Sequence, residues 1–192
     1  MLDVFEEKKV YEVLLVTRSN ITPAGVVRDG KKLRFKLFPG KSFREVLETG
    51  KASIQLTNDP ELLVRTALNL PLKLEFEEQN GHRWIRGLPG VYGNVTSKVE
   101  HWEDNLGETE VLICELVPEG KIEGMLPLRP FSRADCVLVE MAVLFTRYLV
   151  NPREDLREKI LELYSVYRHL GGMSPVSNYM VSFLTKKNQN GW

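Results

Sequence analysis

The sequence predicts a mixed α+β protein in which an antiparallel β-barrel or sandwich comes before a helical C-terminal segment. Short stretches of strand-like pattern, separated by Gly, Pro and Asn turns, fill most of the chain up to residue 120. Little helix is expected between these strands, which favours an antiparallel sheet. From residue 131 onward the apolar residues recur at helical spacing. We therefore divide the chain into a barrel domain (1–120), a linker (121–130) and a three-helix segment (131–186).

The first strands are predicted around one tight hairpin. Residues 9–18 are rich in Val, Tyr and Leu and form the first strand, and residues 19–25 then turn the chain with Pro and Gly. The pair Asp29-Gly30 predicts a two-residue hairpin turn, because such turns need positive φ. In the next strand, 32–38, apolar residues alternate with Lys and Arg. One face of this strand is therefore expected to be apolar and the other basic.

A short helix follows at 42–49, with Ser42 as its N-cap, Glu45 completing a capping box and Gly50 ending it. Its start combines backbone N–H groups, a hydroxyl and nearby cations, and these together suit a phosphate group. The upstream Gly of a P-loop is missing. A solvated basic strand followed by an ordinary capped helix would leave the same local pattern, so both interpretations stay open on these residues alone.

The remaining elements are predicted from caps and periodicity. Asp59 is expected to cap a helix that has Pro60 at its first position, and Asn151 is expected to cap another helix. The further strands are expected at 52–56, 72–77, 91–103 and 110–117, and the further helices at 60–69, 131–150, 152–170 and 174–185.

Composition argues against several classes of function. The formal net charge is zero, from 26 basic and 26 acidic residues. An extended basic surface that binds nucleic acid is therefore not expected. The two cysteines lie in apolar runs and the three histidines lie far apart, so no metal site is expected. The N-terminus lacks the pattern of a signal peptide, and the longest apolar run is too short to cross a bilayer. We expect a cytoplasmic protein without a membrane partner.

The order of several short motifs resembles that of a known family. The earlier motifs are Asn-Ile-Thr-Pro-Ala-Gly-Val (20–26), Lys-Leu-Phe-Pro-Gly-Lys-Ser-Phe-Arg-Glu-Val (36–46) and Ala-Ser-Ile-Gln-Leu-Thr-Asn-Asp (52–59). A later stretch, Pro-Phe-Ser-Arg-Ala (130–134) followed by Glu140 and Thr146-Arg147, is similar to the helical segment of that family. The family is the domain-of-unknown-function family numbered 447, which is largely archaeal and related to flavin reductases and pyridoxamine-phosphate oxidases.

This resemblance implies a flavin-reductase-like split β-barrel of six strands that forms a homodimer, with FMN in a groove at the subunit interface. The chain is then an FMN-binding protein and, if it is an enzyme, a flavin-dependent oxidoreductase of unknown substrate. The residues implied to line the ring or ribityl side of the FMN are Asn20, Thr22, Pro23, Ala24 and Gly25. Those implied to hold its phosphate are Lys36, Lys41, Ser42 and Arg44, and Asn58 is implied to close the site.

Two departures from the family pattern bear on this site. Glu45 and Gln55 each stand where relatives tend to have Asn. The carboxylate of Glu45 is expected to repel a phosphate unless it is turned aside. A split-barrel homodimer that has lost its flavin is therefore one alternative. A nucleic-acid-binding barrel that uses the basic strand face is a second.

Overall fold

A computed structural model describes residues 2–104, 107–127 and 132–186, and these fall into two compact units. The barrel unit extends up to Asn58 and resumes from Leu72 to Pro127, whereas the helical unit takes in Asp59–Pro71 and the described residues from Ser132 onward. The predicted boundaries placed 59–71 in the barrel domain, and the structure assigns this segment to the helices instead. The reason is that Val64 of this segment is 1% exposed and packs in the core of the helical unit.

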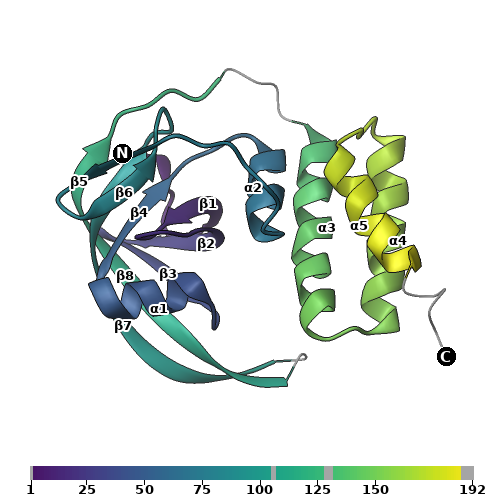
Figure 1. Cartoon of the computed structure of the whole chain (residues 1–192), viewed down its shortest axis with the longest axis horizontal. Coiled ribbons are helices and arrows are strands. Elements are labelled where there is room, and N and C mark those ends of the chain that lie inside the picture. Colours follow the sequence, from purple (N-terminus) through teal and green to yellow (C-terminus); the bar gives the residue numbers. More distant parts are fainter. Residues whose placement is uncertain (1, 105–106, 128–131, 187–192) are drawn as a thin grey trace. The chain divides into compact units, whose positions relative to one another are not determined.

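The barrel unit is a closed antiparallel barrel of six strands, as expected for a split barrel. Figure 1 shows these strands curving around a common interior, and a separate two-stranded sheet consists of β5 (Phe76–Gln79) and β6 (His82–Ile85). A short 3₁₀ turn (Leu2–Val4) precedes the first strand, and α1 (Lys41–Thr49) joins the third barrel strand to the fourth. Around the barrel the order is β1 (Val10–Val16), β2 (Ile21–Asp29), β3 (Lys32–Leu37), β8 (Gly107–Ile122), β7 (Gly90–Asp104) and β4 (Lys51–Gln55).

The β2–β3 hairpin lies where it was predicted, but its two turn residues are Gly30 and Lys31 instead of Asp29 and Gly30. The predicted two-faced strand is confirmed. Asp29 pairs with Lys32, and Gly30 between them has a φ of 59°. In β3 the side chains of Leu33, Phe35 and Leu37 are buried, whereas the basic residues between them are exposed. The turn predicted at 19–25 is too long, because β2 already begins at Ile21. Residues of β2 are needed to fill the barrel, since its Ala24 and Val26 both lie in the core.

The barrel core explains why these strands alternate. It contains large side chains with almost no exposure, including Phe5, Leu15, Leu33 and Leu116. Fully burying one such side chain contributes about 1.5–3 kcal/mol relative to leaving it in water. Replacing Leu33 with Ala would leave a cavity as well, so it is expected to cost about 2–5 kcal/mol.

The helical unit consists of α2 (Pro60–Ala67), α3 (Arg133–Val150), α4 (Glu154–His169) and α5 (Pro175–Lys186). The cap predicted for α2 is confirmed, because a carboxylate oxygen of Asp59 accepts from the backbone N–H groups of Glu61 and Leu62 at 2.9 and 3.3 Å. The cap predicted at Asn151 is wrong. Asn151 ends α3, where its N–H donates to the Arg147 carbonyl at 2.9 Å, and α4 begins only after Arg153.

The core of the helical unit is formed by residues from all of its helices, among them Met141, Phe145, Ile160 and Met180, each at most 1% exposed. One face of each helix therefore contributes apolar side chains to this core, as the helical spacing predicted. None of the helices in the described part of the chain is both long and apolar enough to span a membrane.

Candidate cofactor site at the start of helix α1

The start of α1 lies against the short loop, residues 17–20, that joins β1 to β2. Asn20 Nδ2 donates to Ser42 Oγ at 2.9 Å, and Lys41 Nζ donates to the Ser19 carbonyl oxygen at 3.2 Å. The predicted N-cap at Ser42 is wrong, because Ser42 is already inside the helix and Gly40 is the cap residue. Gly40 has no side chain to accept from the first N–H groups of α1. These groups are thus left to water or to an anionic ligand.

The buried carboxylate of Glu45 binds the same loop through hydrogen bonds. Only 3% of the residue is exposed, and its oxygens accept from Thr17 Oγ1 at 2.6 Å, from the Ser19 backbone N–H at 2.9 Å and from the Ser19 hydroxyl. Burial alone would raise the pKa of Glu45, but the bonds from Ser19 and Thr17 and the positive charge of Lys41 lower it below its ordinary value. Glu45 is therefore ionised, and its carboxylate is hydrogen-bonded to Thr17 and Ser19.

This arrangement corrects the capping box predicted for α1. A capping-box Glu would reach back to the start of its own helix, whereas Glu45 reaches across to residues 17–19. The carboxylate is turned aside from the helix start by bonds that the sequence did not suggest. Its charge is offset by three hydrogen-bond donors, so the expected repulsion of a phosphate is reduced.

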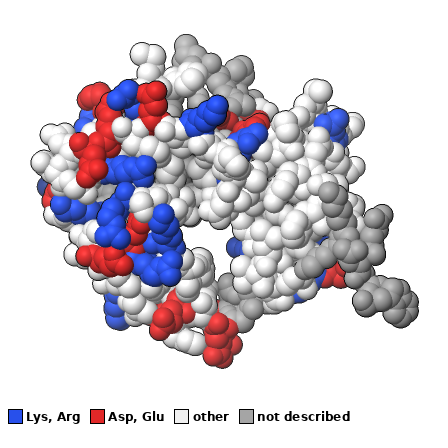
Figure 2. Space-filling view, viewed as in Figure 1, with Lys and Arg blue, Asp and Glu red and all other residues white. Residues whose placement is uncertain are grey.

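Cationic side chains surround the loop and the helix start. Lys41 and Arg44 are exposed on the first turns of α1, and Arg18 in the loop pairs with Glu48 at 2.8 Å. Figure 2 shows Lys and Arg side chains gathered on the part of the barrel unit that carries α1, with Asp and Glu between them. The local potential at the start of α1 therefore favours an anion, although the chain as a whole is neutral.

The segment of β2 that follows the loop presents mainly backbone and small side chains. Thr22 and Pro23 are half-buried, and Gly25 is exposed where a β-carbon would lie 3.2 Å from a methyl group of Val10. Ala24 differs, because it is 6% exposed and packs in the barrel core. The side chain of Ala24 therefore faces the interior of the barrel, so only its backbone is available to a ligand on the outside.

Two predicted residues make contacts of their own away from the loop. Lys36 Nζ lies 3.6 Å from the centroid of the Trp102 ring, a cation–π contact between β3 and the extended part of β7. Asn58 Nδ2 donates to the Pro127 carbonyl at 2.6 Å. The structure thus brings Lys41 and Ser42 into direct contact with the loop that contains Asn20, while Lys36 and Asn58 are held by other parts of the barrel unit.

Gln55, the other departure from the family pattern, has a structural role. It is completely buried, and its Nε2 donates to the carbonyls of Ile85 and Leu88 at 2.9 and 2.7 Å. Its Oε1 accepts from the Ile85 N–H at 2.6 Å. The side chain therefore fastens the segment after β6 to β4. A buried amide with these partners is satisfied without any ligand.

The basic face of β3 is interleaved with acids. Glu115 on the neighbouring strand β8 lies 2.7 Å from Lys32 Nζ and 3.5 Å from Arg34 Nε. Arg34 also lies 3.4 Å from Asp29. A protein surface binds nucleic acid through unpaired cations, which neutralise the phosphates and release their counterions. The cations on this face already have acidic partners. This face offers little support for the nucleic-acid alternative.

Sequence reasoning did not predict that Thr17 and Ser19 bind Glu45. Thr17 follows directly after the buried end of β1 and Ser19 lies two residues further on, and both donate to Glu45. A Glu in the buried stripe of an amphipathic helix was the available signal, since such a residue requires donors from another segment. Which segment supplies them depends on the barrel closing between β1 and β4.

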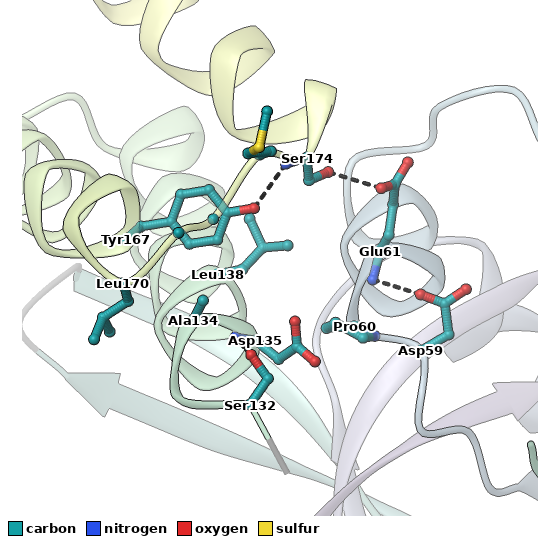
Figure 3. A pocket seen from close by; sticks show the side chains of 13 residues that line it. Asp59, Pro60, Glu61, Ser132, Ala134, Asp135, Leu138, Tyr167, Leu170 and Ser174 are labelled. Carbon is teal, nitrogen blue, oxygen red and sulfur yellow. Dashed lines mark hydrogen bonds between the residues drawn. The ribbon is translucent and has the colours of Figure 1, made fainter. Parts of the chain in front are cut away.

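A cavity of about 300 Å³ lies in the helical unit, and none of the predicted site residues is part of its lining (Figure 3). Figure 3 shows a chain of hydrogen bonds at its rim, in which the Ser174 N–H donates to the Tyr167 hydroxyl at 2.8 Å and the Ser174 hydroxyl donates to Glu61 at 2.8 Å. The carboxylates of Asp59 and Glu61 lie at the start of α2, where negative charge is stabilised by the helix dipole. The start of α2 therefore accounts for these two acidic residues of the lining.

The potential ligands of one metal ion meet at the exposed end of the β7–β8 hairpin, where side-chain atoms of His101, Glu103 and Glu108 all lie within 4.8 Å of one another. The sequence spacing had not indicated such a group. All of these side chains are exposed, and exposed acidic groups often approach one another without an ion.

The closed six-stranded antiparallel barrel and the separate helical unit define a mixed α+β split-barrel protein, in which a cationic helix start is held against a hydroxyl-rich loop. More particularly, the chain belongs to the family of proteins of unknown function called DUF447. The N-terminal domain of that family matches residues 11–123, and its C-terminal part matches residues 132–174.

Among solved structures, the chain is similar to the FMN-bound protein MM1853 from Methanosarcina mazei, a DUF447 protein. The two chains are 21% identical with a TM-score of 0.72, and the match covers 97% of this chain and 99% of that one. They therefore share one fold over nearly their whole length. The styrene monooxygenase flavin reductase from Pseudomonas putida S12 matches at 13% identity and a TM-score of 0.34, over 62% of this chain and 93% of that one. No curated protein matches the chain.

Proposed function

We propose that the barrel unit binds FMN, with the phosphate of the cofactor at the start of α1. The observation that carries this proposal is the network in which Glu45, Lys41 and Ser42 all bind the loop at residues 17–20. The network fixes a hydroxyl-rich loop beside a helix start whose cap residue has no side chain. The similar protein MM1853 is described as FMN-bound, which supports the choice of ligand.

The residues around the helix start divide into two roles. Lys41 and Arg44 are exposed, so with the first backbone N–H groups of α1 they would hold the phosphate directly. Ser42 is 5% exposed and accepts from Asn20, so we assign it a positioning role. Asn20 itself is half-buried, and the bond to Ser42 orients its amide.

The ring and ribityl chain of the cofactor would extend from there along β2. Thr22, Pro23 and Gly25 offer a hydroxyl and accessible backbone, and Ala24 contributes through its backbone. We keep Lys36 and Asn58 as outer members of the site. Lys36 would add positive charge while it stacks on Trp102, and Asn58 would close the far side from its place beside Pro127.

Bound FMN would supply hydride or electron transfer, which suits a flavin-dependent oxidoreductase, and the chain would supply binding and orientation. We further propose that the protein acts as a homodimer. The flavin-free alternative rested on repulsion by Glu45. That argument is weakened because the carboxylate accepts from Thr17 and Ser19.

An absorbance spectrum of the purified protein tests the cofactor, because a bound flavin absorbs at about 450 nm. Protein that is colourless as purified and does not bind added FMN would contradict the proposal and favour the flavin-free alternative. The phosphate position is tested by the double variant Lys41→Ala/Arg44→Ala. Each lost charge-assisted bond costs about 1.5–3 kcal/mol, so FMN affinity should fall at least about 100-fold.

The matched control for this variant is Lys121→Ala, which removes an exposed barrel cation that pairs with Glu123. It should leave FMN affinity unchanged. Circular dichroism and urea unfolding should show that both proteins stay folded. If the double variant binds FMN as tightly as the control does, the phosphate is held elsewhere.

A further inference from the structure

The strand β7 extends well beyond its neighbour on one side. β4 pairs only with Gly90–Asn94, whereas β8 pairs with β7 as far as Asp104. In the described part of the chain, no strand pairs with the outer side of residues 96–104, which we call the β7 edge. Figure 1 shows this part of β7 and β8 running past the other barrel strands as a two-stranded ribbon.

The backbone of the β7 edge has a defined hydrogen-bonding phase. The Val95 N–H donates to the Gly50 carbonyl at 2.8 Å, so Val95 directs its backbone groups toward the outer side. Because these directions alternate along a strand, Ser97, Val99 and His101 direct theirs to the same side. Donors and acceptors at this spacing are a ready template for another strand.

The side chains of the β7 edge carry opposite charges around an exposed apolar residue. Val99 is 40% exposed. On either side of it, the side chains of Lys98 and Glu100 are 78% and 45% exposed. A second strand laid along this edge would therefore meet one apolar residue with a cation before it and an anion after it.

We propose that a second copy of this chain pairs with the β7 edge in an antiparallel arrangement, about a two-fold axis at Val99. Val99 then lies opposite the partner's Val99. Lys98 lies opposite the partner's Glu100, and Glu100 lies opposite the partner's Lys98. These charged pairs occupy the positions without mutual hydrogen bonds, where facing side chains come closest.

Charge favours this register over the two neighbouring registers that the backbone phase also allows. A pairing centred on Lys98 would place that residue opposite the partner's Lys98. A pairing centred on Glu100 would place that residue opposite the partner's Glu100. Like charges directly opposite each other on paired strands are destabilising, so the register centred on Val99 is favoured over both. An isologous contact of this kind closes as a dimer.

This inference rests on the proposed homodimer but not on the proposed cofactor, so the two are tested separately. Lys98→Glu and Glu100→Lys would each turn both charged pairs of the dimer into like-charge pairs. Each variant should weaken dimerisation about 10-fold or more, and the double swap Lys98→Glu/Glu100→Lys should restore it. Sedimentation equilibrium over a range of concentrations measures the dissociation constant, and FMN content is recorded in the same samples.

A wild-type monomer at all concentrations would overturn this interface, and so would single variants that dimerise like the wild type. Flavin retained by a monomer would leave the cofactor proposal intact. Flavin absent from a dimer that responds to the charge swap would leave the interface intact.

Disulfide formation tests the axis itself. In a Cys136→Ser background, which removes the exposed native thiol and leaves only the buried Cys114, Val99→Cys should form a disulfide-linked dimer on mild oxidation. The reason is that facing residues of paired strands lie about 5.5 Å apart between Cα atoms, within the range of a disulfide. Thr96→Cys is the matched control, because its copy lies far along the partner strand. Equal cross-linking of the two variants would overturn the register.

Discussion

Two carboxylates, Glu45 in the barrel unit and Glu61 in the helical unit, show how similar residues take different roles. Each lies near the start of a helix and accepts from the hydroxyl of a serine in another segment. For both, burial would raise the pKa, and hydrogen bonds lower it below the ordinary value. They differ in their other partners. Glu61 pairs with Arg65 at 2.8 Å on its own helix, whereas Glu45 has only loop donors in direct contact.

The difference between their partners shows which part of the structure each carboxylate stabilises. A carboxylate that pairs with a cation one helical turn away stabilises that helix, and it does so modestly. A buried carboxylate whose donors all belong to one loop determines the conformation of that loop instead. The loop at residues 17–20 carries the Asn20 and Ser19 groups that contact the start of α1. Glu45 therefore links the stability of the barrel to the geometry of the candidate site.

The largest expected effect is that of Glu45→Ala. It leaves Thr17 Oγ1 and the Ser19 N–H without their acceptor in a buried place, so the free energy of unfolding should fall by about 2–4 kcal/mol. Glu48→Ala is the control, because Glu48 is exposed and pairs only across the surface with Arg18. It should cost about 0.5 kcal/mol or less. Urea unfolding of both variants gives the comparison, and equal costs would contradict the role assigned to Glu45.

The second largest effect is expected at low pH, where the stability that Glu45 contributes should be lost. Because the pKa of Glu45 is lowered in the folded protein from an ordinary value of 4.5, its contribution to stability is present above about pH 4.5 and is lost as the pH falls through the lower, folded value. Glu45→Gln should therefore lose less stability than the wild type between about pH 5 and pH 3. Unfolding measured at several pH values tests this. Parallel curves for the two proteins would count against it.

The smallest effect is expected in the helical unit. Glu61→Ala and Ser174→Ala should each cost about 1 kcal/mol, because the bond between them is partly exposed and Arg65 can reach water. A double-mutant cycle should give a coupling energy of about 0.5–1.5 kcal/mol. Additive costs would show that Ser174 and Glu61 do not interact in solution. Neither variant should change FMN affinity, in contrast to variants of Glu45.

Local patterns predicted much of the fold. The β2–β3 hairpin, the two-faced strand β3 and the Asp59 cap depend on residues that are neighbours in the sequence. The structure confirms the strand and the cap, and it places the hairpin turn one residue later than predicted, at Gly30 and Lys31. The cap at Asn151 failed because two helices compete for one connection, and the residue ends the first of them. The turn at 19–25 was too long because Ala24 is needed in the barrel core.

The candidate site was predictable only in part. Lys41, Ser42 and Arg44 lie on one short helix, so their proximity followed from their spacing. The contact of Asn20 with Ser42 joins residues that are 22 positions apart, and it depends on how β1 and β4 pair. Lys36 was expected to face the phosphate, and its contact with Trp102 arises only because β7 extends past β4.

The sequence by itself determined the class of fold, the presence of a short helix with cations in its first turns and the neutral overall charge, because periodicity and composition are local properties. The tertiary structure alone decided where Glu45 points, which loop it holds and which strand edge is left unpaired. A buried carboxylate takes its donors from whichever segment the closed barrel brings beside it. That choice is made by strand pairing between distant residues, and no pattern within a single segment records it.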